Sequence, residues 1–430
     1  MRILKDGLAF LIVGFATSTL TISFLPLHSA RIISVLAIFI VLIILCEAKV
    51  LIRIKGLTIY SILLFFVLYS GFSTVLSNSA DLVFFKKSIS LLIDGVPCSI
   101  LIAVVLIYKN KLNDFPQDRA FYDFCTYYFW FSVLISITVL ISFLNPDFRT
   151  IAEGLFPAQG NITDSSHPDY LYRVRGILPA TGASASVYFA FGIVLGLIET
   201  ERLVGGSFFK SLTMVFGFFS LIFALTLNGR SGFVVLLIGV IIFSLNFIYK
   251  VLANYRISIK TVFRARALLL VVVSTIAFLV YPLFGDSKAI DRLTEDVGLI
   301  ISSGGSKGTT GALMEMYFLP SSSAEFLFGD VSTFNSNRIP SDAGYVRVLH
   351  AIGILGFIIF YLFWFSSYLI IFISKISARV KASCFFLIVA MFVLELKEPF
   401  FLYLYSSIII MVPISIYCLS PRIESRMRNE

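Results

Sequence analysis

Long, uninterrupted runs of apolar residues make up most of the chain, and short polar segments separate them. The runs 233–249 and 268–284, for example, contain no charged side chain. Runs of roughly 17 to 20 apolar residues match the thickness of the hydrocarbon core of a bilayer. Each such run therefore predicts a membrane-spanning helix.

The apolar runs are continuous, which decides between the two kinds of membrane fold. Backbone polar groups must be paired inside the protein in a bilayer, so only helices or closed barrels cross it. A barrel strand alternates apolar and polar residues, and these runs do not. We therefore predict an all-α, polytopic membrane domain over residues 1–430, with about twelve spanning helices. The predicted spans are residues 7–25, 31–47, 57–77, 88–108, 121–144, 178–199, 208–227, 231–249, 266–284, 350–373, 380–396 and 400–419.

Composition and charge agree with this class. Hydrophobic residues make up 58% of the chain and charged residues 14%, whereas soluble domains carry roughly 25% charge. The formal net charge of +9 comes from basic residues in short loops, as the positive-inside rule produces. No soluble basic domain remains to bind nucleic acid. The five cysteines include no CxxC pair, so neither a disulfide framework nor a zinc site is indicated.

Alternate loops carry the basic residues, which predicts that both termini lie in the cytoplasm and that the first helix is uncleaved. Lys86, Lys87 and Lys397 fall on the outer side as exceptions. Two long connections, residues 145–177 and 285–349, are also predicted to lie outside. Long loops of this kind commonly carry function.

The charged residues near the outer surface are the candidates for chemistry. They are Arg173, Arg175, Arg230, Arg338, Asp342, Arg347 and His350. Arginine donates paired hydrogen bonds to phosphate oxygens and stays charged, so converging arginines suit a diphosphate. The alternatives are snorkelling anchors and ordinary solvated loop residues. Asp342 precedes a predicted helix, where its carboxylate acts on substrate or caps the helix. His350 is either a base or a structural histidine.

Other kinds of catalytic site find no support in the motifs. GxSxG, Walker and HExxH patterns are absent from the sequence. Neither His28 nor His167 lies close in the sequence to a set of carboxylates and cysteines with metal-ligand spacing. We predict no metal and no cofactor.

Residues 341–357 read SDAGYVRVLHAIGILGF, and their close, GI-x-G from Gly353, is the most recognisable part. This segment resembles the loop-to-helix signature of O-antigen polymerases (Wzy) and the related O-antigen ligases. Phe328-Gly329-Asp330 resembles the short glycine motif that precedes this signature in the family. The segment from Arg173 to Ala180 resembles the family's Arg-x-x-Gly segment. Residues 227–232 (LNGRSG) resemble the family's arginine turn. The ligase signature typically begins with histidine where this chain has Asp342, which favours polymerase.

The resemblance implies a GT-C-like membrane glycosyltransferase of the bacterial inner membrane, with its active site facing the periplasm. Such an enzyme moves a growing glycan from undecaprenyl diphosphate to the non-reducing end of a lipid-linked repeat unit, without a metal. Arg173, Arg175 and Arg230 would bind the diphosphates, with Arg338 or Arg347 contributing, and Asp342 would position or deprotonate the acceptor. Membrane lipid and a chain-length regulator protein are the implied partners. The alternatives are an O-antigen ligase and a flippase or transporter for a lipid-linked oligosaccharide. A flippase or transporter should carry charged residues at mid-membrane depth.

Overall fold

The computed structural model is helical and divides into two compact units. Unit 1 contains residues 1–19, 29–124 and 316–430, and unit 2 contains residues 20–28 and 125–315. The structure describes residues 2–25, 27–46, 50–52, 54–77, 81–110, 116–157, 174–180, 182–203, 208–229, 231–252, 315–334, 341–374 and 376–421. The predicted span 266–284 lies outside these residues.

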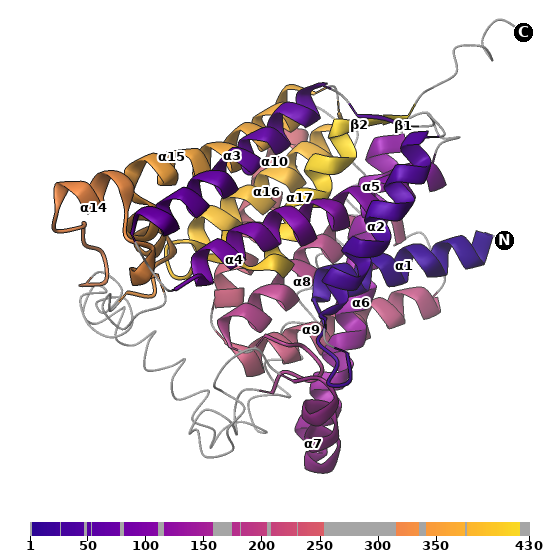
Figure 1. Cartoon of the computed structure of the whole chain (residues 1–430). Helices are drawn as coiled ribbons and strands as arrows, with labels where there is room; N and C mark the ends of the chain where they lie inside the picture. Colours follow the sequence, from indigo (N-terminus) through magenta and orange to yellow (C-terminus); the bar gives the residue numbers. More distant parts are fainter. Residues whose placement is uncertain are drawn as a thin grey trace, which may run out of the picture. The chain divides into compact units, whose positions relative to one another are not determined.

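Unit 1 contains most of the helices that the structure describes, and Figure 1 labels them. Its elements are α1 (Arg2–Ser18), α2 (Ser29–Cys46), β1 (Val50–Ile52), α3 (Ile54–Leu76), α4 (Val83–Ser90), the π-helix η1 (Leu91–Gly95), α5 (Val96–Lys109), α14 (Ser323–Phe328), the 3₁₀ turn η3 (Val331–Thr333), α15 (Gly344–Ile373), α16 (Ala378–Leu394), the 3₁₀ turn η4 (Phe400–Leu402), α17 (Leu404–Cys418) and β2 (Leu419–Pro421). The start of α6 (Pro116–Leu144), as far as Phe124, also belongs to unit 1.

Four helices among the described residues are long and apolar enough to cross a membrane. They are Thr58–Leu76, Val83–Lys109, Pro116–Leu144 and Gly344–Ile373. Shorter apolar helices are found at Ser29–Ile40, Ala183–Ile198, Leu212–Asn228, Ser231–Leu245 and Leu404–Cys418. These features mark the chain as a helical membrane protein, as the sequence predicts.

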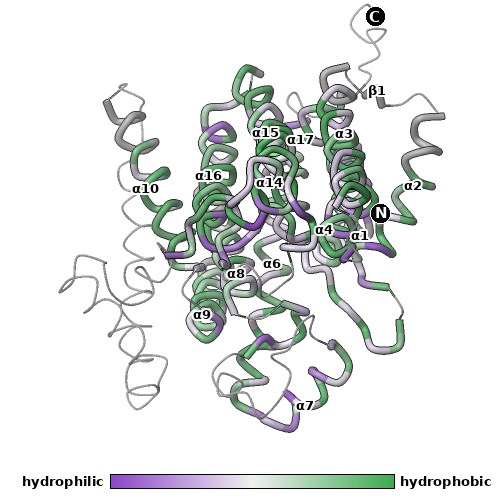
Figure 2. Tube along the Cα trace, turned by 60° about the vertical axis from the view of Figure 1, so that its left-hand side comes forward, coloured by the Kyte–Doolittle hydropathy of each residue, from purple (hydrophilic) through white to green (hydrophobic). Residues whose placement is uncertain are grey.

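One face of α3 shows why a bilayer is the natural solvent for these helices. Phe65, Leu68, Phe72 and Val75 recur every three or four residues and are all exposed. In water a stripe of this size would be strongly unfavourable, whereas it costs nothing against lipid. Helix α15 carries a similar exposed stripe and packs beside α3 (Figure 1). Hydropathy mapped along the trace shows hydrophobic residues over most of α3, α15 and α16 (Figure 2).

Several predicted helix boundaries differ from the structure; the spans predicted to begin at residues 88, 121 and 178 begin at Val83, Pro116 and Ala183. Two further differences have a clear physical reason. Helix α1 ends at Ser18 instead of residue 25, because Thr19 takes a left-handed conformation with φ +48°. Helix α15 begins at Gly344 instead of residue 350, because Glu395 accepts hydrogen bonds from its first N–H groups. The second long connection therefore ends at residue 343, and it contains α14 and η3.

A two-stranded antiparallel ribbon was not predicted. Leu51 of β1 pairs with Ser420 of β2, so the chain entering α3 and the chain leaving α17 are joined. Three-residue strands are too short to give a recognisable alternation in the sequence.

A sharp bend interrupts α15 at Gly353, which has φ +64° and ψ −178°. The bend frees carbonyl groups of the preceding turn, and other elements use them. The backbone N–H of Asp330 donates to His350 O at 2.7 Å, and the Tyr69 hydroxyl donates to Ile352 O at 3.2 Å. A side chain at Gly353 would collide with the backbone of Leu327 and Phe328. Glycine is therefore needed both for the conformation and for the close approach.

Unit 2 consists of most of α6, with α7 (Pro146–Leu155), α8 (Ala183–Leu203), α9 (Phe208–Asn228) and α10 (Ser231–Leu252). Helix α8 packs against both α9 and α10. Small residues permit close helix contacts, since a side chain at Gly192 would meet Ser132 and one at Gly196 would meet Phe129. Helix α7 lies within the first long connection, and the Asn145 side chain caps its N-terminus.

We expect Gly353→Ala to lower the free energy of unfolding by about 1–3 kcal/mol, since it adds both an unfavourable φ and a backbone collision. The thermal unfolding midpoint in detergent measures the effect. Gly7→Ala is the matched control, because nothing lies within 4 Å of a side chain added there. Equal midpoints for Gly353→Ala and the parent protein would contradict this account of the bend.

Candidate functional site

Charged and aromatic side chains from four elements of unit 1 gather at the N-terminal end of α15. We call this group the α15 polar cluster. Its members are Lys87 of α4, Asp342 and Arg347 at the start of α15, Glu398 of the turn after α16, and Tyr403 before α17. The cluster brings together two residues predicted from the sequence, Asp342 and Arg347, with three that were not assigned a role.

Asp342 does not cap α15, so the capping alternative is wrong. The N-cap residue is Ala343, which makes no side-chain cap. The Glu395 carbonyl accepts from Gly344 N at 2.9 Å and from Tyr345 N at 3.3 Å, and it takes the place of a capping side chain. The Asp342 side chain is 66% exposed. Its carboxylate is therefore accessible to a second molecule.

Arg347 orients the Asp342 carboxylate. Its Nη2 lies 3.2 Å from Asp342 Oδ1, and its Nε donates to the Ser341 carbonyl at 2.6 Å. The Arg347 side chain is 30% exposed. Two contacts with the loop hold the guanidinium in place, and an exposed part of the side chain remains for an anion.

His350 is buried away from this pair. Its Nε2 lies 3.3 Å from the Phe318 carbonyl, and its ring packs edge to face on the Phe318 ring at 5.2 Å. Its own carbonyl accepts from Asp330 N. These contacts give His350 a structural part in joining α15 to the preceding connection.

Glu395 lies in the turn after α16 and is fully buried. Its Oε1 accepts from the Tyr361 hydroxyl at 2.8 Å and its Oε2 from Phe401 N at 3.1 Å. Burial raises the pKa of Glu398.

In unit 2, the chain around Arg175 packs against the turn between α9 and α10. Arg175 is buried, and its Nη1 donates to the Leu178 carbonyl at 2.6 Å. Asn228 Nδ2 donates to the Val174 carbonyl at 2.8 Å, and the Ser186 hydroxyl accepts from Gly232 N at 3.1 Å. The Arg-x-x-Gly segment and the arginine turn are therefore joined. Arg173, Arg230 and Arg338 lie outside the described residues.

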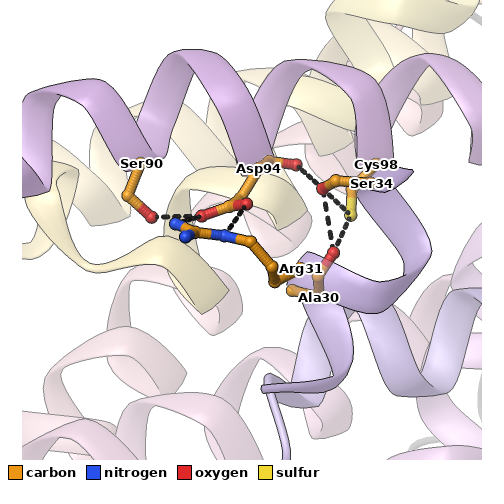
Figure 3. Close-up of polar contacts among 6 residues, drawn as sticks. All are labelled: Ala30, Arg31, Ser34, Ser90, Asp94 and Cys98. Carbon is orange, nitrogen blue, oxygen red and sulfur yellow. Dashed lines mark hydrogen bonds and ion pairs between the residues drawn. The ribbon is translucent and has the colours of Figure 1, made fainter. Parts of the chain in front are cut away.

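A second polar group lies inside the span Val83–Lys109 (Figure 3). Asp94 is fully buried on η1, where a π-turn widens the helix. Arg31 of α2 holds its carboxylate with two hydrogen bonds of 2.6 Å, and Ser90 adds a third of 2.7 Å. Ser34 donates to the Asp94 carbonyl at 2.9 Å. This bidentate pair ties α2 to the long span and neutralises both charges.

Sequence reasoning assigned no role to Lys87, Glu398, Arg31 or Asp94. Lys87 was visible as an exception to the positive-inside rule, and Asp94 as an acid within an apolar run. Both observations indicate an unusual environment, but neither predicts which residues Lys87 and Asp94 contact. Two comparisons add no family to this picture, since no family model matches the chain and no curated protein is detectably similar to it.

Proposed function

We propose that this protein is a polysaccharide polymerase of the O-antigen type. It transfers a growing glycan from undecaprenyl diphosphate to the non-reducing end of a lipid-linked repeat unit. The single observation that carries the proposal is the pairing of motif segments distant in the sequence. Phe328-Gly329-Asp330 packs on the Gly353 bend of unit 1, and Val174 is hydrogen-bonded to Asn228 in unit 2.

This pairing supports the resemblance because it explains why each short motif needs the residues that it has. Gly329 has φ +77°, and a side chain there would collide with the backbone of Ile352 and Gly353. The two glycines are thus needed for the same contact. Degenerate motifs that fold onto one another are better evidence of a shared architecture than the same motifs scattered over a surface.

The proposed chemistry is a glycosyl transfer. The acceptor hydroxyl oxygen bonds to the anomeric carbon while the bond from that carbon to the diphosphate oxygen breaks. The diphosphate leaves with the bonding electrons and gains negative charge, which fixed cations stabilise. In the proposal Arg173 and Arg230 bind the diphosphates and Arg347 or Arg338 contributes. Arg175, which is buried and donates to the Leu178 carbonyl, supports the segment next to Arg173 instead of binding a diphosphate. Asp342, exposed and oriented by Arg347, takes the proton of the acceptor hydroxyl.

The proposal includes about twelve spans in a GT-C-like arrangement in the bacterial inner membrane, with the α15 polar cluster facing the periplasm. The substrate would reach it laterally from the lipid, as suits a diphosphate held at the bilayer surface. A chain-length regulator is the proposed protein partner.

A flippase for a lipid-linked oligosaccharide is the second candidate, and the Arg31–Asp94 pair inside a span is the observation that favours it. The pair is mutually neutralised, which suits a structural tie better than binding of a charged cargo. A ligase is the third candidate, and Asp342 at the position of the ligase histidine argues against it.

Deletion of the gene should leave surface lipopolysaccharide capped with a single repeat unit, because repeat units still cross the membrane and are still ligated. Electrophoresis of lipopolysaccharide measures this. Absence of any repeat unit at the surface would indicate a flippase instead, and polymer retained on undecaprenyl diphosphate would indicate a ligase.

Substitution of the proposed diphosphate ligands tests the site itself. Arg230→Ala and Arg173→Ala, expressed in the deletion strain, should lower polymer formation by roughly 100-fold or more, since each removes a cation that stabilises the leaving group. Arg379→Ala, on the predicted cytoplasmic side, is the control. Immunoblots of membranes verify that each variant inserts. Wild-type polymer from both arginine variants would rule out the diphosphate clamp.

A further inference from the structure

Lys87 stands out among the cations of unit 1 because of what surrounds it. Its ammonium group lies 4.8 Å from the centre of the Tyr403 ring and 5.4 Å from that of the Phe334 ring. Aromatic faces attract a cation by roughly 0.5–2 kcal/mol but do not neutralise it. Within the described part of the chain, no carboxylate lies within the 4.0 Å of a salt bridge to Lys87.

The neighbouring residue Lys86 shows that this is a particular environment and not a property of the helix end. Lys86 is exposed, whereas Lys87 is half-buried between the two rings. A lysine that serves only as a membrane anchor extends its ammonium into the water and headgroups. Lys87 is instead held against η3 and the start of α17.

Lys87 also faces the candidate site. Phe334 follows η3, which the Asp330 side chain caps, and Tyr403 donates to the Glu398 carboxylate at 3.2 Å. The charges of Lys87 and Arg347 act on one another, and Glu398 acts on both. Glu398 acts on both cations and Asp342 is paired with Arg347, so a phosphate bound by Lys87 and Arg347 would compete with these two carboxylates.

We propose that Lys87 binds a phosphate group of the lipid-linked substrate together with Arg347. The inference rests on the proposed function and adds a ligand that the sequence motifs do not contain. Arg347 presents a planar fork held by the loop, and Lys87 supplies a compact charge that the rings position. The phosphate belongs to a prenyl diphosphate, because Lys87 lies near the start of the membrane span Val83–Lys109.

Binding of farnesyl diphosphate to the purified protein in detergent tests this directly. Lys87→Met keeps the length of the side chain and removes its charge, and we expect it to weaken binding by at least about tenfold. Lys86→Met is the matched control and should bind within about twofold of the parent protein. Lys87→Arg keeps the charge and should bind within about threefold. Parent-like binding by Lys87→Met, or no binding by the parent protein, overturns the inference.

A measurement on the unmodified protein removes any dependence on how the variants fold. Saturating farnesyl diphosphate should slow the labelling of the Lys87 amine by an amine-reactive reagent, read by mass spectrometry, and leave Lys86 unaffected. Inorganic diphosphate at the same concentration should protect less, because it lacks the prenyl chain. Equal labelling of Lys87 with and without farnesyl diphosphate overturns the inference, and equal protection by inorganic diphosphate overturns the assignment to a lipid.

Failure here is distinguishable from failure of the proposed function. If Lys87→Met binds farnesyl diphosphate normally while the gene deletion leaves single-repeat lipopolysaccharide, Lys87 is not a ligand and the polymerase proposal stands. If Lys87→Met loses binding while the deletion leaves polymer length unchanged, the phosphate site stands and the polymerase proposal fails.

Discussion

The first turn of α15 and the last turn of α16 share the hydrogen bonds of Glu395. A helix begins with backbone N–H groups that have no partner in the helix. In α15 the Glu395 carbonyl accepts two of them, while the carboxyl group of the same residue receives the Tyr361 hydroxyl and the Phe401 N–H. One buried residue thus joins α15, α16 and η4. Gly344 is required at this junction, because a side chain there would meet the Glu395 carboxyl group and the Glu398 carbonyl.

The α15 polar cluster depends on this junction. Asp342 and Arg347 flank the turn that Glu395 holds, and Glu398 and Tyr403 follow Glu395 along the chain. Because Glu395 takes over the capping role, the Asp342 side chain remains exposed at the site. Burial of the Glu395 carboxyl group costs free energy, and in return the Asp342 carboxylate remains accessible for chemistry.

The sequence predicted the helical membrane class and the approximate position of α3, α6 and α15, since long apolar runs report directly on a lipid environment. It did not predict the bend at Gly353, the early start of α15 or the β1–β2 ribbon. Each of these depends on a contact between distant segments, such as Leu327 with Gly353, that periodicity does not record. For the site, the motifs pointed to Asp342 and Arg347 but not to Lys87, because a lysine between two aromatic rings has no local sequence pattern.

The span Val83–Lys109, which contains the π-turn η1, carries a basic and an acidic residue with different partners. Residues seven apart on a uniform α-helix return to nearly the same face, and Lys87 and Asp94 are seven apart on one continuous span. The wider turn contains Asp94, and the acid meets Arg31 on α2 while Lys87 meets the rings of Phe334 and Tyr403. Acid and base on the same helix thus have separate surroundings, and each retains its own partner.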